Sequence, residues 1–219
     1  MLTTKSIVRT AAVCLTAALT ASPVLAGDPT DLGKQVAEEM MKAAQDPAAM
    51  QKWMASGQPG VAHEFLVAAF VGEWDVTMKM WMDPEGEPTV AEGTSTVTEM
   101  LEGRFIREEF TVPMMGMPFT GIGFTGYDNN RKLFVASWMD TMSTGISTMA
   151  GSVNEDGTVL TFVGEMNEPM TGQVGKAYMS VNTIHGPDHH TFEMWEVLYG
   201  EPFKVMQIEY RRSGSADAN

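Results

Sequence analysis

The stretch FVGEWDVTMKMWM, residues 70–82, decides the fold, because its side chains alternate with a period of two. Apolar residues occupy the even positions, namely Trp74, Val76, Met78, Met80 and Met82. The odd positions Glu73, Asp75, Thr77 and Lys79 are polar. This alternation predicts a β-strand with one buried face and one face in water. Gly72 lets the backbone bend into the strand, and we expect the Trp74 indole to plug its foot.

From residue 72 to residue 212 the chain consists of short segments separated by turn residues. The turns are predicted at residues 83–86, 102–103, 128–130, 154–157 and 185–188, which are rich in Asp, Asn, Gly and Pro. Strands are expected at residues 73–82, 89–101, 104–112, 119–127, 132–140, 144–153, 158–165, 174–184, 190–199 and 203–212. About ten strands without intervening helices predict an antiparallel β-protein. We predict a closed up-and-down barrel, because closure removes exposed strand edges.

The first 26 residues have the pattern of an export signal. Lys5 and Arg9 precede an apolar run at residues 10–19, and Val24-Leu25-Ala26 supplies small residues for cleavage. The apolar run is too short to cross a bilayer. We therefore expect an exported bacterial protein, periplasmic or secreted, that begins at Gly27. The lone cysteine, Cys14, lies inside the signal, so the processed chain has no disulfide.

The charge of the chain excludes some partners. Cleavage after residue 26 leaves 12 basic residues (14 minus Lys5 and Arg9) against 28 acidic ones, a net charge of −16. Such a charge repels nucleic-acid phosphates and anionic lipid headgroups. The chain has no later hydrophobic run long enough to span a membrane. Nucleic acid and a membrane span are therefore not expected, and the sequence does not fix the oligomeric state.

Residues 27–70 are predicted to be a helical N-terminal segment. Asp28 can cap a helix over residues 32–45, whose face carries Leu32, Val36, Met40 and Ala43. Shorter helices are expected at residues 47–55 and 63–70. We expect these helices to cover the outside or an open end of the barrel, and a partner-binding arm is the alternative. The barrel domain is predicted at residues 71–212 and a disordered tail at residues 213–219.

Two short motifs resemble the signature of the calycin superfamily, which includes lipocalins and fatty-acid-binding proteins. They are Gly72-Glu73-Trp74 on the first strand and Tyr210-Arg211-Arg212 on the last. In calycins the Gly-x-Trp tryptophan stacks under an arginine from the last strand. The resemblance implies that Arg211 or Arg212 covers Trp74 and closes the barrel floor. Physical reasoning agrees, because the first and last strands of a closed barrel are neighbours and a guanidinium binds favourably to an indole face.

A more particular resemblance covers roughly residues 60–212. The segments FIREEF (105–110), PMMGMPF (113–119), GYD (126–128) and WMD (138–140) look like those of a family of secreted bacterial proteins known as domain of unknown function 1579. That family has no activity to carry over, so the resemblance supports a fold and not a chemistry.

The sequence contains no standard catalytic or phosphate-binding motif. The processed chain has no cysteine, and no serine lies in a Gly-x-Ser-x-Gly elbow. Residues 121–126 spell G-x-G-x-x-G, but they lie within a predicted strand and do not open a helix, so we reject them as a dinucleotide site. The sequence assigns no cofactor.

Histidine is a weaker candidate for chemistry. His185, Asp188 and His189 have zinc-ligand side chains at a predicted turn, where we expect an exposed loop instead of a metal site. A haem-binding branch of the calycins uses a histidine inside the barrel, and His190 at a strand start is the nearest equivalent. Only its position supports that role, so we predict no metal ligand.

Methionine is unusually frequent, at 20 of 219 residues. One hypothesis is Cu(I) binding in the periplasm, because thioether ligands suit a soft ion. The other is that flexible methionines line an adaptable apolar pocket. We favour the pocket, because the methionine-rich segment at residues 114–117 has no histidine nearby. Pro113 and Pro118 flank this segment, which we expect to form a flap at the barrel mouth.

The predicted strand at residues 104–112 carries charge on both faces. Arg104 and Glu108 alternate with Ile106 and Phe110 on one face, while Arg107 and Glu109 lie on the other. One charged set must therefore face inward. We expect Arg107 to be the polar anchor of a ligand, although a buried Arg–Glu pair is also a common structural feature. An enzyme with a carboxylate and arginine site, using Glu109 and Glu196, is the alternative.

The leading hypothesis is a binding protein that holds a small apolar or amphipathic molecule inside the barrel. The predicted ligand-binding residues are Trp74, Val76, Met78, Met80, Arg107, Glu109, Met114, Met115, Met117, Trp138, Met194 and Tyr210. Trp74 with Arg211 and Arg212 is predicted to close the barrel.

Overall fold

The computed structural model describes residues 28–114, 116–168, 171–198 and 201–215. The chain begins with the helices α1 (Pro29–Gln45), α2 (Pro47–Ser56) and α3 (Val61–Phe70). Ten strands follow: β1 (Gly72–Met80), β2 (Thr89–Met100), β3 (Phe105–Met114), β4 (Met117–Asp128), β5 (Leu133–Asp140), β6 (Ser147–Val153), β7 (Val159–Glu168), β8 (Gln173–Gly186), β9 (His189–Leu198) and β10 (Glu201–Arg212). The proposed export signal, at residues 1–26, lies outside the described residues.

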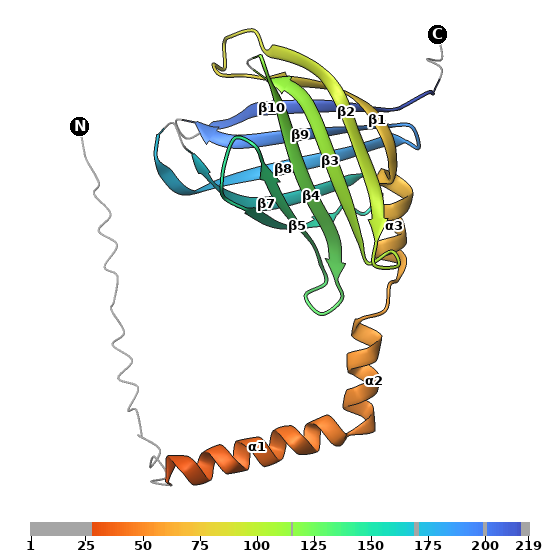
Figure 1. Ribbon diagram of the computed structural model, residues 1–219, viewed down its shortest axis with the longest axis vertical. Coiled ribbons are helices and arrows are strands. Elements are labelled where there is room, and N and C mark those ends of the chain that lie inside the picture. Colours follow the sequence, from red (N-terminus) through yellow and green to blue (C-terminus); the bar gives the residue numbers. More distant parts are fainter. Residues whose placement is uncertain (1–27, 115, 169–170, 199–200, 216–219) are drawn as a thin grey trace, which may run out of the picture. The chain divides into compact units, whose positions relative to one another are not determined.

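The ten strands form one closed antiparallel barrel, in which each strand pairs with its neighbours in the sequence (Figure 1). β1 closes the sheet because it pairs with β2 on one side and with β10 on the other. Within this seam Trp74 lies between Ser95 of β2 and Arg212 of β10. The prediction of a closed up-and-down barrel is therefore confirmed.

The strands β3 and β4 extend further toward their hairpin than the predicted strands at residues 104–112 and 119–127. β3 continues to Met114 and β4 starts at Met117, so that Pro113 pairs with Pro118 and Met114 with Met117. Met115 lies outside the described residues. The pairing continues this far because it satisfies backbone N–H and C=O groups, which would otherwise need water as their hydrogen-bond partner.

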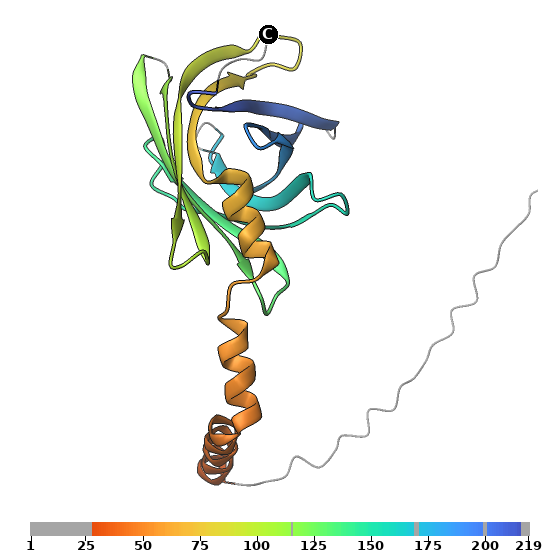
Figure 2. The same cartoon turned by 90° about the vertical axis from the view of Figure 1, so that its right-hand side faces the viewer.

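α3 closes one end of the barrel (Figure 2). Three of its side chains make edge-on ring contacts with strand residues: His63 with Tyr127, Phe65 with Phe134, and Phe70 with His190. Leu66, on the same face of the helix, is only 1% exposed. The helix is therefore part of the core, which explains its strongly apolar sequence.

The segment before α3 is tied to two turns of the barrel. The Asn129 side-chain amide donates to the backbone carbonyls of Ser56 (3.0 Å) and Gln58 (2.8 Å). The Arg104 guanidinium donates from Nε to the Gly57 carbonyl at 2.9 Å. These bonds fix the entry of α3, because they hold the chain just before the helix begins.

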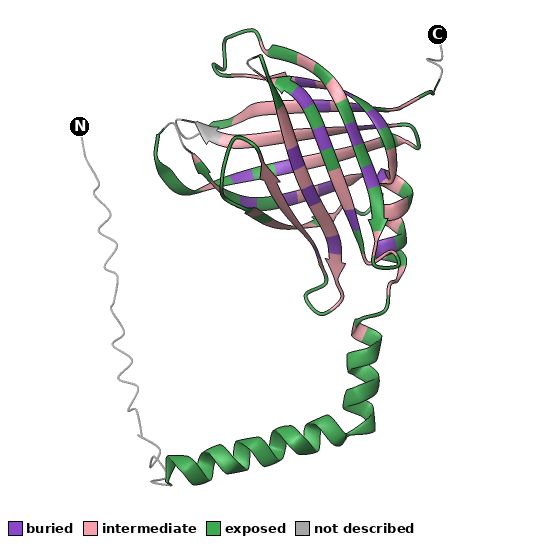
Figure 3. Cartoon of the chain, in the orientation of Figure 1, coloured by how far each residue is buried: buried purple, intermediate pink, exposed green. Residues whose placement is uncertain are grey.

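The chain divides into two compact units, and the division in the sequence falls between Met50 and Gln51. The second unit contains α3 together with the barrel. In the first unit, Asp28 caps α1 by accepting from the Thr30 amide at 2.8 Å. None of the residues of α1 is buried (Figure 3). No helix in the described ranges is both long and apolar enough to cross a membrane.

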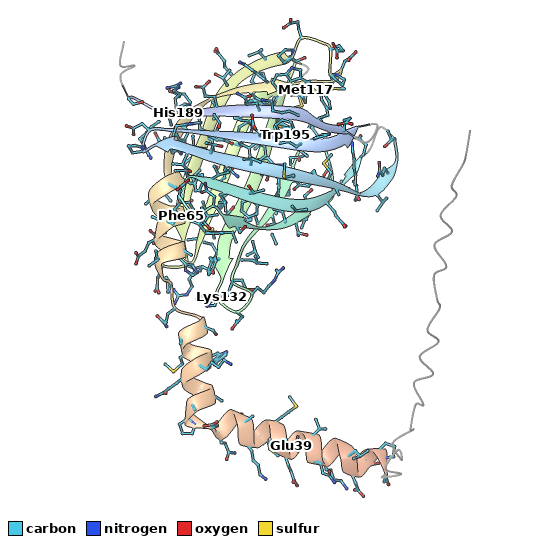
Figure 4. All side chains as sticks on the ribbon, turned by 180° about the vertical axis from the view of Figure 1, so that it is seen from behind. Glu39, Phe65, Met117, Lys132, His189 and Trp195 are labelled. Atoms are coloured by element: carbon cyan, nitrogen blue, oxygen red, sulfur yellow. The ribbon has the colours of Figure 1, made fainter. Side chains whose placement is uncertain are left out.

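The strand β4 runs from one end of the barrel, at Met117, to the other, at Asp128. Figure 4 shows Met117 at the tip of the β3–β4 hairpin and Lys132, just beyond β4, at the other end, together with Phe65 of α3. We call the end beside α3 the closed end. We call the end where β3 finishes and β4 begins the mouth.

Candidate functional site

The closed end is locked by an arginine that covers a tryptophan. The Arg212 guanidinium carbon lies 4.4 Å from the centre of the Trp74 ring. The same guanidinium donates to the carbonyls of Val71 (3.2 Å) and Pro187 (2.8 Å) and pairs with Asp188 (3.0 Å). Of the two arginines, Arg212 is thus the one that covers Trp74.

Arg211 occupies the opposite face of β10 and pairs with Glu209. The reason is the strand period of two, which sends neighbouring residues to opposite faces of the sheet.

Gly72 is required next to this lock. Its backbone has φ +151°, and a Cβ at this position would overlap the Arg212 guanidinium. The Trp74 indole N–H donates to the Phe70 carbonyl at 2.9 Å, at the end of α3. The Gly-x-Trp motif therefore joins three elements, because the helix end, the first strand and the last strand all meet there.

His190 is enclosed by aromatic rings beside Trp74. Its ring stacks on Tyr210 at 4.2 Å between centroids and meets the edges of Trp74 and Phe70 at 4.6 and 5.2 Å. Burial, together with the nearby His189, lowers the pKa of His190 from 6.5 to about 3. Both ring nitrogens are buried and neither has a hydrogen-bond partner. His190 is therefore neutral at physiological pH.

A haem group does not fit this arrangement. An axial histidine must present one ring nitrogen to open space, whereas both nitrogens of His190 are shielded from water and the residue is 4% exposed. Reaching them would require displacing Phe70 or Trp74, and both of these side chains belong to the core. His190 is a packing residue in this structure.

Glu108 lies on the inner wall, in the middle of the barrel. Its neighbours on the same face of β3, Ile106 and Phe110, are buried core residues. The Glu108 Oε1 atom accepts hydrogen bonds from the Ser95 hydroxyl (2.7 Å) and the Tyr210 hydroxyl (3.1 Å). Burial raises the pKa of Glu108, and the two hydroxyl donors oppose this shift. Burial and the adjacent Glu108 raise the pKa of Tyr210 well above 10.0.

Trp138 lies next to Glu108 on the inner wall, across two glycines of β4. Gly123 pairs with Glu108 on one side and with Trp138 on the other. The indole lies against Gly121 and Gly123, and a Cβ at Gly121 would overlap the ring. The Trp138 N–H donates to Asp140 at 2.9 Å. The glycines thus provide the space that lets a large aromatic ring lie flat along the wall.

Inward-facing residues nearer the mouth are only partly buried. Met149 and Met206 pack against the core, and Met194 pairs with Met206 and with the fully buried Ser180. All three methionines are nevertheless half-buried, as is Trp138. Water therefore reaches inward-facing apolar side chains in this half of the barrel.

A charged pair lies beyond these methionines. Lys176 forms an ion pair with Glu196, and Glu168 lies 4.0 Å away. Lys176 shares its face of β8 with the buried Tyr178, and Glu196 shares its face of β9 with Met194. The inner wall of the mouth half thus combines an apolar lining with a charged pair.

The structure separates the predicted ligand-binding residues into three groups. Trp74, Val76, Met78 and Tyr210 are buried in the core, whereas Met80, Met114, Trp138 and Met194 are half-buried and face inward. Arg107 and Glu109 form an ion pair on the outer face of β3, and Met117 is 58% exposed at the hairpin tip. Met115 lies outside the described residues. The expected anchor Arg107 is therefore not on the wall that faces the ligand space.

Sequence reasoning did not select Glu108, Ser95 or Lys176. Glu108 alternates with the apolar Ile106 and Phe110, which could have indicated that it faces inward. Arg104 lies on the same predicted face, however, so that face appeared as polar as the one with Arg107 and Glu109. In the structure Arg104 bonds back to Gly57 at the closed end and leaves the inner wall. Ser95 and Lys176 gave no signal, because only strand pairing places them on the inner wall.

The described residues do not assemble a recognisable metal centre. They contain no group of three or more His, Cys, Asp or Glu side chains arranged to hold an ion. The histidines lie at the closed end, as the contacts of His63 and His190 with Tyr127 and Phe70 show, whereas Met114 and Met117 lie at the mouth. The described methionines of the β3–β4 hairpin thus lie at the end of the barrel opposite to these histidines.

Two surface hollows offer weaker sites. One, of about 390 Å³, lies between α3 and the β2–β3 turn and includes His63, Glu99 and Glu102. The other, of about 500 Å³, lies between residues 141–147 on one side and residues 167, 168 and 172–174 on the other. Neither hollow includes Glu108 or Trp138, so the inner wall, where a carboxyl group and an indole face the interior together, is the better candidate.

Comparison with known proteins supports the fold and the family. No functionally curated protein matches the sequence. The barrel is similar to the crystal structure of Rv2717c from M. tuberculosis, with 15% sequence identity, a TM-score of 0.51, and coverage of 71% of this chain and 99% of that one. At this identity the likeness shows the fold alone. The family model described as "Protein of unknown function (DUF1579)" matches residues 58–212, and the chain therefore belongs to the DUF1579 family.

Proposed function

We propose that this protein binds a small amphipathic molecule inside the mouth half of its barrel. The observation that carries the proposal is the incomplete burial of inward-facing residues there. Trp138, Met149, Met194 and Met206 face the interior but remain partly accessible to water. An interior that serves only stability is packed nearly as densely as an organic crystal. Accessible apolar surface inside a barrel is typical of a ligand site.

The chemistry of the lining supports an amphipathic ligand. Methionine side chains are flexible and polarisable, so they adapt to apolar ligands of different shapes. The Trp138 indole adds a flat aromatic face, and the Lys176–Glu196 pair and Glu108 add polar groups. A ligand with an apolar body and a polar group therefore matches both parts of the wall.

Filling the mouth from within tests this proposal. Ala91 is half-buried on β2 and pairs with the buried Met78, so its methyl group faces inward. Ala177 on β8 is exposed and its side chain faces outward, because it alternates with Lys176 and Tyr178. The substitutions Ala91→Trp and Ala177→Trp add the same indole to a strand on the inside and on the outside. We expect the neutral dye Nile red to bind the parent protein and Ala177→Trp, and to bind Ala91→Trp at least about tenfold more weakly.

Fluorescence titration of Nile red measures these affinities, and thermal melting checks that both variants are folded. Equal affinity in the two variants would show that the dye binds outside the barrel. Absence of binding to the parent protein would also contradict the proposal. Native mass spectrometry of protein purified from its own host then reveals a retained ligand by its mass.

Export across the inner membrane belongs to the same proposal, and it is supported by the pattern of residues 1–26. N-terminal sequencing of protein from the periplasmic fraction tests it. We expect the chain to start at Gly27, and an unprocessed start at Met1 in the cytoplasmic fraction would contradict export.

A further inference from the structure

Glu108 is an acidic side chain on the inner wall for which the described residues form no ion pair. The Glu108 side chain is half-buried among core residues, and desolvation raises the pKa of its carboxyl group. Among the described residues, no positively charged group contributes to that shift. An isolated carboxylate in such a place opposes folding, because burial disfavours the ionised form. The barrel therefore carries, on its inner wall, an acidic group whose ionisation opposes folding and which lacks a cationic partner among the described residues.

The two oxygens of this carboxyl group differ in their contacts. Oε1 accepts both hydroxyl hydrogen bonds, from Ser95 and from Tyr210. Oε2 receives no hydrogen bond from the described part of the chain. It is not fully buried either, unlike the unpaired ring nitrogens of His190. Oε2 is therefore accessible from the interior of the barrel. Two hydroxyls fix the orientation of the group and leave one acceptor free.

Trp138 lies in the same row of the inner wall as Glu108. Glu108, Gly123 and Trp138 form one row across β3, β4 and β5, and all three face inward. A Cβ added at Gly123 would be 3.7 Å from the Glu108 Cβ and 3.2 Å from the nearest atom of the Trp138 ring. The carboxylate and the indole thus lie on the same face of the sheet, with only a glycine between them. An anion next to an accessible indole is the combination that recognises a cation.

We infer that the ligand is a cationic amphiphile, such as an alkylamine, whose ammonium group binds Glu108 Oε2 beside the Trp138 ring while its apolar body extends along Met149, Met194 and Met206 toward the mouth. This inference rests on the proposed function and adds the chemical class of the ligand. The ammonium group supplies the positive charge that Glu108 lacks. It also supplies hydrogen-bond donors to the acceptor that the protein leaves free.

The charge of the protein favours a cation over an anion. The formal net charge is −14, so the field of the whole protein attracts cationic ligands. A ligand carboxylate at this position would face the Glu108 carboxylate, and like charges at contact distance repel. A neutral alcohol can donate one hydrogen bond to Oε2 but does not neutralise its charge. We therefore expect the order of affinity to be amine, then alcohol, then carboxylate.

Displacement of Nile red by three ligands of equal chain length tests this order. The ligands are decylamine, decanol and decanoate, which differ only in the polar group and its charge. The whole protein is compared with Glu108→Gln and Glu109→Gln. These variants lose the same charge at neighbouring positions, but Glu109 lies on the outer face of β3, where it pairs with Arg107. The second variant therefore controls for non-specific attraction of amines to the acidic surface.

We expect decylamine to bind the parent protein and Glu109→Gln at least about tenfold more tightly than decanol, because hydrogen bonds to charged groups are stronger than neutral ones. In Glu108→Gln the preference for the amine should disappear, while decanol should bind as before. If Glu108→Gln does not fold, Ser95→Ala replaces it, because Ser95 only orients the carboxylate. That variant should reduce the preference for the amine without abolishing it.

Other outcomes separate this inference from the proposed function. Equal binding of the three ligands, tighter binding of decanoate, or an amine preference that survives in Glu108→Gln would overturn the inference. In each of these cases the barrel still binds amphiphiles, so the proposed function stands. A parent protein that binds neither Nile red nor any of the three ligands would overturn both.

Discussion

The two ends of this barrel contain similar apolar side chains but bury them to different extents. At the closed end, Trp74 and Leu66 are each 1% exposed, and α3 seals the interior. At the mouth, Trp138 faces the same interior but remains half-buried beside the charged side chains of the inner wall. The closed end is therefore packed for stability. The mouth half retains accessible apolar surface and the acidic Glu108, and both features lower stability. Such a combination is typical of functional sites.

The largest expected effect compares the two inward tryptophans. Trp74→Ala should lower the free energy of unfolding by about 3–5 kcal/mol, because it removes a fully buried indole. Trp138→Ala should cost only about 1–2 kcal/mol, since the ring it removes is already partly accessible. Urea unfolding followed by circular dichroism measures both values. Equal losses would contradict the distinction between the two ends.

A second effect concerns acid stability and depends on His190 at the closed end. Its pKa is about 3 in the folded protein, against 6.5 for an exposed histidine. Below pH 6.5 the unfolded chain binds a proton that the folded protein does not bind, so stability falls with decreasing pH. The loss from this group between pH 6.5 and pH 4 should be roughly 3 kcal/mol.

The variant His190→Phe isolates this contribution, because phenylalanine can stack on Tyr210 without titrating. We expect the unfolding free energy of the variant to depend less on pH over this range than that of the parent protein. Parallel pH profiles for the two proteins would show that His190 is not the group responsible.

The third effect distinguishes the two arginines at the end of β10. Arg212→Lys should cost about 1–2 kcal/mol, because lysine cannot both cover the Trp74 ring and donate to two carbonyl groups. Arg211→Lys should change stability by less than about 0.5 kcal/mol, since that side chain is exposed. Thermal melting of the pair provides the comparison. A larger loss for Arg211→Lys would mean that the roles are reversed.

The smallest effect has the opposite sign and belongs to the inner wall. Burial raises the pKa of Glu108 above 4.5, so its ionised form opposes folding at neutral pH. Glu108→Gln keeps an acceptor for Ser95 and Tyr210 but removes the charge. We expect it to increase the unfolding free energy at pH 7 by up to about 1 kcal/mol and to have less effect at pH 4. A marked loss of stability at pH 7 would indicate that the carboxylate supports the fold.

The candidate site illustrates how far sequence reasoning extends. The alternation in residues 105–110 predicted a strand with charges on both faces, and it correctly required one set to point inward. It selected Arg107, whereas the structure places Glu108 on the inner wall. The choice depends on where Arg104 lies, and that residue is drawn away by the Gly57 carbonyl, 47 positions earlier in the chain. A contact between such distant segments leaves no local pattern.

The sequence by itself determined the antiparallel strands and their closure into a barrel. The reason is that a period of two, turn residues at regular intervals and the Gly-x-Trp motif are local features, which follow from backbone geometry. Only the tertiary structure decided which end is sealed and which acidic side chain lies inside. Those outcomes depend on the packing of α3 and on the pairing of Glu108, Gly123 and Trp138 across three strands, and both bring together residues whose separation in the chain carries no periodic signal.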